Sequence, residues 1–131
     1  AEPFEPQQAD RTVHRTAQRK FHPAAAPQGD EPVIRDGEDL HRLCAQRGIL
    51  HLFFLGFNTN ACVMMRDYGL PEMARRGYHT IVLRDCTTGM EIADTLPTLA
   101  CTKGTIASIE QFLGFSMTAD DLTQALGGRR T

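Results

Sequence analysis

The chain has 131 residues, of which 41% are hydrophobic and 23% are charged, a composition that suits one packed domain. Its 14 lysine and arginine residues nearly balance its 16 acidic residues, and both halves of the chain share this balance. An even charge distribution excludes a basic surface for nucleic acid or anionic lipid. No apolar run approaches the ~20 residues that a membrane-spanning helix needs. We therefore expect neither a nucleic-acid nor a membrane partner.

Residues 1–31 differ from the rest of the chain because they are polar and rich in proline. Within them, residues 12–21 fit a short helix and the following prolines predict a loop. Several basic side chains cluster here and fit either a solvated face or a contact with a substrate anion. We expect 1–31 to be a loop or lid segment and 32–131 to be an α/β domain, part of a longer single domain.

From residue 32 onwards, apolar runs alternate with helix-capping and turn residues. The runs predict strands at 32–35, 49–57, 78–83 and 105–109. The segments between and after them predict helices at 39–47, at 61–76 with a kink or restart at 69–71, at 91–100 and at 119–126. Strand followed by helix throughout predicts an α/β fold: a Rossmann-like, mainly parallel sheet with helices on both faces.

The cysteine and histidine residues indicate free thiols and no metal. The four cysteines are Cys44, Cys62, Cys86 and Cys101, and no pair has the C-x-x-C spacing of a zinc or redox site. A core-forming composition with unpaired cysteines favours a reducing compartment, so we expect a cytoplasmic protein. Three scattered histidines, His41, His51 and His79, favour structural roles, and we expect no metal and no cofactor.

Cys62 has the position best suited to chemistry. It follows the predicted strand 49–57 and the capping residues 58–60, so it lies in the first turn of a predicted helix. Helix N-termini carry partial positive charge and unpaired N–H groups, which stabilise a thiolate and an oxyanion. The alternative is a buried, inert thiol, which the other three cysteines fit better.

The segment around Cys62 resembles a known family. Residues 56–63, Gly-Phe-Asn-Thr-Asn-Ala-Cys-Val, resemble the G-x-x-T-x-x-C-V turn of the isochorismatase-like cysteine hydrolases. Residues 77–86 are similar to the glycine-aromatic, strand and acid pattern of that family. The resemblance covers about residues 32–126. It implies a Rossmann-like sheet and hydrolysis of amides, ureido compounds or related substrates, usually in homo-oligomers.

The resemblance also implies roles for particular residues. Cys62 would be the nucleophile that forms an acyl or carbamoyl intermediate. The N–H groups of Ala61 and Cys62 would form the oxyanion hole, with Phe57 and Asn58 beside the substrate. The peptide bond between Phe57 and Asn58 would be cis.

Three features depart from the family pattern. The catalytic aspartate of the family lies on a first strand to which nothing here corresponds, and Asp10 is not an obvious substitute; the chain resembles the later two-thirds of such an enzyme. Arg35 stands nearest the place of the catalytic lysine, where its permanent charge would hold an anion or a thiolate. Lys20 and Lys103 are further candidates for that role. Residues 69–71 lengthen the cysteine-bearing helix, which suggests a distinct subfamily.

Two functions remain open at this stage. The first is a cysteine hydrolase acting on a small amide or carbamoyl compound through Cys62 and a backbone oxyanion hole. The alternative is a non-catalytic domain for small-molecule binding or assembly that kept the fold without the aspartate and lysine. We expect the chain alone to be incomplete and inactive. Its expected partners are a small-molecule substrate and either further copies of the chain or a missing N-terminal portion of the same protein.

Overall fold

The computed structural model describes residues 20–127, which divide between Val33 and Ile34 into two compact units. In the first unit, the described residues form one short 3-10 helix, η1 (Pro23–Ala25), and otherwise have no regular structure. This agrees with the loop expected from the prolines. The helix predicted at 12–21 lies outside the described residues, apart from its last two positions.

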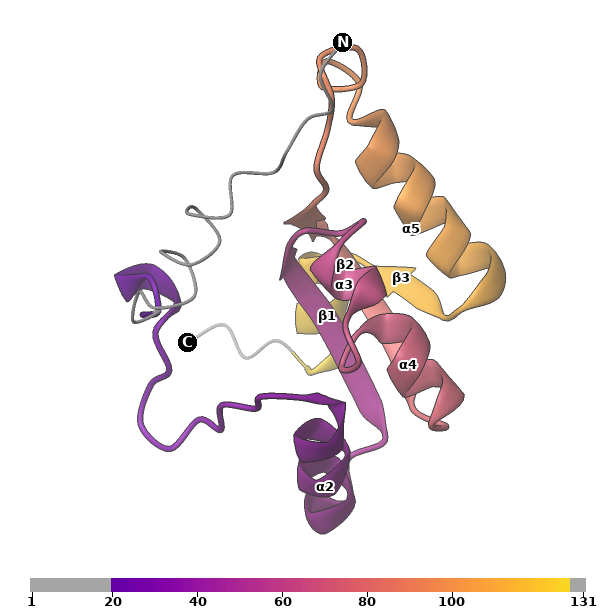
Figure 1. Ribbon diagram of the computed structural model, residues 1–131. Helices are drawn as coiled ribbons and strands as arrows, with labels where there is room; N and C mark the ends of the chain where they lie inside the picture. Colours follow the sequence, from indigo (N-terminus) through magenta and orange to yellow (C-terminus); the bar gives the residue numbers. More distant parts are fainter. Residues whose placement is uncertain (1–19, 128–131) are drawn as a thin grey trace, which may run out of the picture. The chain divides into compact units, whose positions relative to one another are not determined.

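The second unit contains a three-stranded sheet in the order β1-β2-β3, and both pairings are parallel. The strands are β1 (His51–Phe57), β2 (His79–Thr88) and β3 (Phe115–Met117). The helices of this unit are α2 (Gly37–Arg47), α3 (Cys62–Met65), α4 (Leu70–Arg75), α5 (Ala100–Phe112) and α6 (Ala119–Ala125) (Figure 1). Helices α3, α4, α5 and α6 pack against the sheet, and α2 packs against α4. The predicted α/β class with a parallel sheet is confirmed. Within 20–127, no helix is both long enough and apolar enough to cross a bilayer.

Capping residues define α2 as the sequence predicts. The Asp36 carboxylate accepts a hydrogen bond from the Asp39 N–H at 2.8 Å and so begins the helix. Gly48 ends it with φ 64°, a left-handed conformation that costs glycine little. Helix α6 begins in a similar way, because Thr118 and Asp121 form a capping box.

The core lies between the sheet and the helices α3, α4 and α5. Its buried cluster consists of Val63, Leu70, Val82 and Ile109. The expected break in the cysteine-bearing helix is confirmed: α3 ends after one turn, and α4 restarts with Pro71 in its first turn. Gly69 permits the restart, since a Cβ there would meet the Val63 carbonyl oxygen at 2.8 Å.

Two predicted elements after β2 are wrong. The strand predicted at 105–109 lies inside α5, where Thr105 and Ser108 bond their hydroxyls to carbonyls four residues earlier. The β-branched residues that suggested a strand are therefore accommodated in a helix packed on β2 and β3. The helix predicted at 91–100 is a series of turns instead, because Pro97 interrupts it and the side chain of Glu91 caps α5.

Three further differences concern the strands: one predicted strand is absent, one is longer than predicted and one was not predicted. No strand forms at 32–35, because the Arg35 N–H bonds to the Asp39 carboxylate of α2 instead of to a neighbouring strand. Strand β2 continues to Thr88, past the polar residues that suggested a loop, with a register shift opposite Phe54–Gly56. Strand β3 was missed because three residues are too few to show an alternating pattern.

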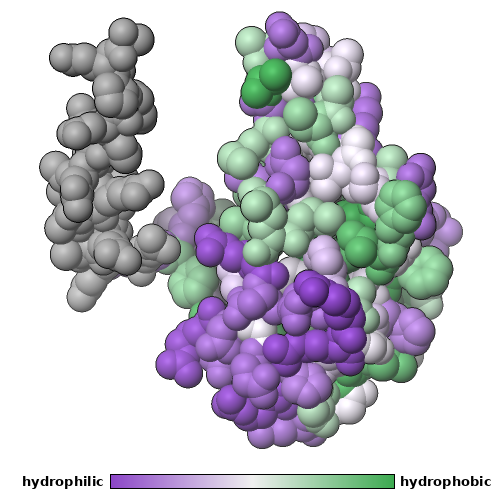
Figure 2. All heavy atoms as spheres, turned by 45° about the vertical axis from the view of Figure 1, so that its right-hand side comes forward, coloured by the Kyte–Doolittle hydropathy of each residue, from purple (hydrophilic) through white to green (hydrophobic). Residues whose placement is uncertain are grey.

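The surface of this unit is divided by polarity. Figure 2 shows hydrophilic side chains gathered at its lower end, where Figure 1 places α2 and α4. There, Arg76 of α4 pairs with Glu38 of α2 at 3.0 Å. Hydrophobic surface is spread above this end in Figure 2.

Candidate functional site

Cys62 is the first residue of α3 and follows β1 after a four-residue turn, Asn58–Ala61, referred to below as the cysteine turn. The peptide bond between Phe57 and Asn58 is cis, as the resemblance implied. The carbonyl oxygen of Asn58 accepts hydrogen bonds from the N–H groups of Ala61 at 3.1 Å and Val63 at 3.2 Å. These two bonds close the turn around Cys62, whose side chain is partly exposed.

Two buried threonines fasten the cysteine turn to the end of β2. The Thr87 hydroxyl donates to the Gly56 carbonyl at 2.8 Å, and Thr59 and Thr87 share a hydrogen bond of 2.7 Å. Since the single proton of Thr87 goes to Gly56, Thr59 is the donor in the shared bond. The Thr59 N–H also donates to the Thr88 carbonyl at 3.1 Å. The turn is therefore held by the sheet and not only by its own backbone.

Asn60 fastens the other side of the turn to the loop after β2. Its amide nitrogen donates to the Met90 carbonyl at 3.0 Å, and its amide oxygen accepts from the Met90 N–H at 2.8 Å. The neighbouring Gly89 N–H donates to the Thr102 hydroxyl of α5 at 2.9 Å. The sequence motif contains Asn60, but its partner thirty residues later could not be predicted from spacing.

Glu91 of the same loop caps α5. Its carboxylate accepts hydrogen bonds from the N–H groups of Cys101 at 3.0 Å and Thr102 at 2.7 Å. Partial burial raises the pKa of this carboxyl, but the hydrogen bonds from Thr102, Thr95 and Cys101 outweigh it and lower the pKa to about 2. The positive end of α5 is therefore already occupied by an internal anion.

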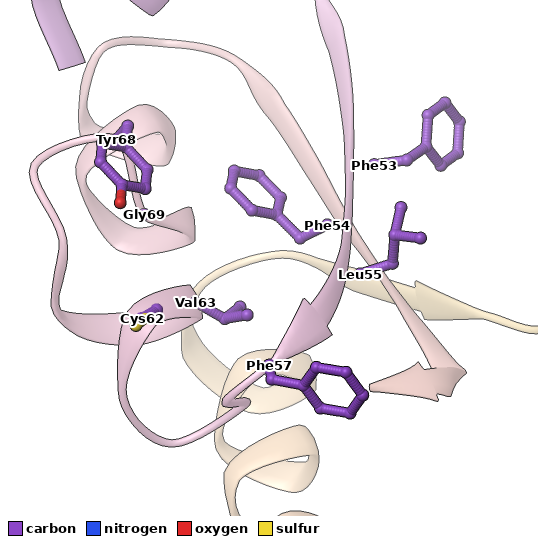
Figure 3. Close-up of a pocket in the computed structure, with 8 residues that line it drawn as sticks. All are labelled: Phe53, Phe54, Leu55, Phe57, Cys62, Val63, Tyr68 and Gly69. Atoms are coloured by element: carbon purple, nitrogen blue, oxygen red, sulfur yellow. The ribbon is translucent and has the colours of Figure 1, made fainter. Parts of the chain in front are cut away.

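Two cavities border Cys62. The first, of about 370 Å³, is referred to below as the edge groove. Its lining consists of Phe53, Phe54, Leu55, Phe57, Cys62, Val63, Tyr68 and Gly69. Figure 3 shows Phe54 and Val63 on the side of β1 that faces α3 and α4, and Phe53, Leu55 and Phe57 on the opposite side. Because residues from both faces of β1 line it, this groove runs along the outer edge of the strand.

The second cavity, of about 330 Å³, is referred to below as the arginine cavity. It is lined by Ala61, Cys62, Met65 and Arg66, so that it combines a thiol with a guanidinium group. Arg66 lies one turn after Cys62, and its interaction with the Cys62 side chain raises the pKa of the guanidinium. Sequence reasoning missed Arg66, although its spacing of four residues from the cysteine was a usable signal.

The backbone around Cys62 offers fewer free donors than a long helix would. The N–H of Ala61, one of the two expected oxyanion-hole donors, is already bonded to Asn58. The N–H of Cys62, the other, has no hydrogen-bond partner among the described residues. With only four residues, α3 aligns few peptide dipoles, so its macrodipole is weaker than expected of the longer predicted helix. Nearby side chains therefore matter more for charge at this site.

The structure does not bring Arg35 to Cys62. The Arg35 side chain is 83% exposed, bonds to Asp39 at 3.1 Å and lines neither cavity. Lys103 lies on α5 and Lys20 lies in the first unit, and neither lines these cavities. Asp10 lies outside the described residues.

The remaining thiols and imidazoles have structural surroundings. All four cysteines are free, and burial raises the pKa of the Cys44 thiol. His41 bonds to the Tyr78 hydroxyl at 2.7 Å, and His51 stacks on His79 across β1 and β2 with ring centres 5.0 Å apart. Among residues 20–127, no group of three metal-ligating side chains converges.

The fold and the cysteine turn define a class of protein: an α/β domain with a parallel sheet that presents a cysteine at the carboxyl end of a strand. A family model described as Isochorismatase domain matches residues 1–105, and the chain belongs to the isochorismatase family, which is of hydrolase type. The match extends beyond the motifs around Cys62 into the proline-rich first stretch. A search of curated protein sequences gave no match.

Proposed function

We propose that the protein is a cysteine hydrolase that cleaves a C–N bond in a small amide or carbamoyl compound, with Cys62 as nucleophile. The observation that carries the proposal is the combination at one turn of a partly exposed thiol, an N–H with no partner within residues 20–127 and a neighbouring guanidinium. A cavity of about 330 Å³ at the thiol suits a small substrate.

The reaction proceeds in two halves. The Cys62 thiolate attacks the carbonyl carbon, and the displaced electron pair moves to the carbonyl oxygen. We assign the stabilisation of this oxygen to the Cys62 N–H, which has no hydrogen-bond partner among the described residues. When the C–N bond breaks, the leaving nitrogen takes a proton from an acid and a thioester remains. Water then attacks the thioester and gives a proton to a base, and the S–C bond breaks to restore the thiolate.

The four described residues that line the arginine cavity do not supply both the acid and the base. Of its four lining residues, only the thiol exchanges a proton readily near neutral pH, because arginine stays protonated. The resemblance assigns the two proton transfers to an aspartate and a lysine. An activated ester can acylate Cys62 without an acid to protonate the leaving group, whereas amide hydrolysis needs one. The nucleophilic role of Cys62 can therefore be tested on this chain with such an ester.

The test uses p-nitrophenyl acetate, whose leaving group departs without protonation. We expect a burst of p-nitrophenolate and an acetyl group on Cys62, located by peptide mass spectrometry. Cys62→Ser should lower the burst rate by about three orders of magnitude, as loss of a nucleophile does. Cys101→Ser is the matched control and should leave the burst unchanged. Acetylation spread evenly over the exposed cysteines would contradict the proposal.

A second function, a non-catalytic domain for binding or assembly, is favoured by one observation. Arg35, which stands nearest the place of the family lysine, is 83% exposed and lines neither cavity. This alternative predicts no burst at Cys62 in the ester experiment, so the same measurement separates the two functions.

We further propose that an N-terminal segment of the same protein adds as a strand to the open edge of β1. Among the described residues β1 pairs only with β2, and Leu55 and Phe57 are 59% and 78% exposed. An apolar edge strand with free backbone groups favours pairing with another strand. The existing pairings are parallel, as a crossover within one chain gives, whereas a two-fold contact between copies would pair β1 antiparallel.

Hydrogen exchange of the β1 amides tests this partner. In the full-length protein we expect protection at the outer edge that does not depend on concentration. Protection that rises with concentration would indicate a homo-oligomer and contradict the proposal.

We also propose a cytoplasmic location, since four free thiols suit a reducing compartment.

A further inference from the structure

Arg66 differs from most arginines of the described part in having no carboxylate partner. Five of them form ion pairs with acidic residues, namely Arg35, Arg42, Arg75, Arg76 and Arg84. Between residues 20 and 127, no ion pair involves Arg47 or Arg66. Of these two arginines, Arg66 lines a cavity that borders Cys62, whereas Arg47 lines neither of the two cavities described above.

The surroundings of Arg66 leave its charge available to a ligand. Among residues 20–127, no acidic side chain lines this cavity, and the other lining residues are Ala61, Cys62 and Met65. Asp67, the next residue, acts on the guanidinium more weakly than Cys62 does. A guanidinium group presents a planar fork of N–H donors that matches the two oxygens of a carboxylate.

We propose that Arg66 binds a carboxylate of the substrate, so that the substrate is an amide or carbamoyl compound that carries a carboxylate. The inference rests on the proposed function, because it places the bond to be cleaved at Cys62. The two residues line the same cavity, so one small molecule can reach both the thiol and the guanidinium. Arg66 is then a specificity-determining residue: by binding the carboxylate, it positions the carbonyl of the same molecule near the Cys62 sulfur.

Two alkylating reagents of nearly equal size test the inference without knowledge of the substrate. Iodoacetate carries a carboxylate and iodoacetamide carries a neutral amide. With either reagent the thiolate sulfur forms an S–C bond, the C–I bond breaks and iodide leaves. Peptide mass spectrometry measures the rate at Cys62, and the neutral thiol N-acetylcysteinamide gives the reference ratio of the two rates.

We expect the iodoacetate-to-iodoacetamide rate ratio at Cys62 to exceed the reference ratio. Arg66→Gln should lower it by roughly three- to tenfold, the range for a charge-assisted contact of an exposed side chain. Arg66→Lys should keep part of the preference, because the charge remains while the fork is lost. Arg47→Gln is the matched control, since it also removes an unpaired arginine, and it should leave the ratio unchanged. Added salt should weaken the preference.

The outcomes separate this inference from the proposed function. If Arg66→Gln slows the reaction with both reagents equally, Arg66 only stabilises the Cys62 thiolate, and the proposal that it binds a carboxylate is wrong. If the ratio equals the reference in the wild type, the inference also fails, whereas rapid alkylation of Cys62 by iodoacetamide would leave the proposed function intact. If Cys62 reacts no faster than Cys101 with iodoacetamide, the proposed function itself fails.

Discussion

Helices α3 and α5 both have a cysteine in the first turn, and the two cysteines differ in the hydrogen bonds and charges around them. In α5, Cys101 is the second residue, and its N–H and that of Thr102 both bond to the Glu91 carboxylate. In α3, Cys62 is the first residue, its N–H has no partner among the described residues, and its side chain shares a cavity with the guanidinium of Arg66. The longer helix has the larger dipole, but its positive end already binds an anion.

The comparison shows that a cysteine at a helix start is not sufficient for reactivity. What matters is whether the backbone donors are still free and which charge lies opposite the sulfur. By both criteria we expect Cys62 to be the better nucleophile, although its helix has only four residues. The predictions that follow perturb either the turn that holds Cys62 or the Glu91 cap, which we expect to lower the reactivity of the Cys101 thiol.

The largest effect is expected from loosening the cysteine turn. Thr59→Val removes the hydrogen bond from Thr59 to Thr87, both of which are buried. We expect a loss of about 1–2 kcal/mol in the free energy of unfolding. The rate of Cys62 acetylation should fall by about tenfold, because the sulfur is no longer held in one geometry.

Thr80→Val is the matched control for this change. Thr80 is also buried, and its hydroxyl donates to the Leu113 carbonyl at 3.2 Å, away from the cysteine turn. It should lower stability by a similar amount, measured by urea unfolding, without changing the rate at Cys62. Equal loss of rate in both variants would show that the Thr59 contact has no special role in positioning the thiol.

A smaller effect is expected on stability from removing the cap of α5. The folded-state pKa of Glu91 is about 2, below its ordinary value of 4.5. Its stabilising contribution is therefore complete above about pH 4.5 and is lost as the pH falls towards 2. Glu91→Gln should lower Tm at neutral pH, and the difference from the wild type should shrink through this window. Asp94→Asn, in the same loop, is the control: it leaves the cap of α5 intact and should not change Tm at neutral pH.

The smallest effect is expected at Cys101 itself. Glu91→Gln removes the negative charge from the start of α5 and so makes this site more similar to that of Cys62. We expect iodoacetamide to alkylate Cys101 a few-fold faster in this variant, because the Cys101 and Thr102 N–H groups are then no longer bonded to a negative charge. An unchanged rate at Cys101 would show that burial, and not the cap, keeps this thiol unreactive.

Much of the site could be predicted from local sequence because it depends on short-range signals. The apolar run 49–57 predicts β1, and the capping residues after it predict the cysteine turn, whereas its cis peptide bond was implied by the resemblance to a known family. Asp36 and Gly48 predict the ends of α2 in the same way. Arg35 illustrates the limit, since its position along the chain suggested a role beside Cys62, whereas its side chain turns to Asp39.

The sequence by itself therefore determined that β1 and β2 are parallel strands that follow one another along the chain, and that Cys62 comes after β1. Only the tertiary structure decided that residues 105–109 are helical, because their packing on β2 and β3 outweighs the strand propensity of β-branched residues. It also decided which helix start is left open, since the capping carboxylate of Glu91 comes from a loop ten residues before Cys101. Hydrogen bonds and charges between distant segments depend on the folded backbone, and no local pattern encodes them.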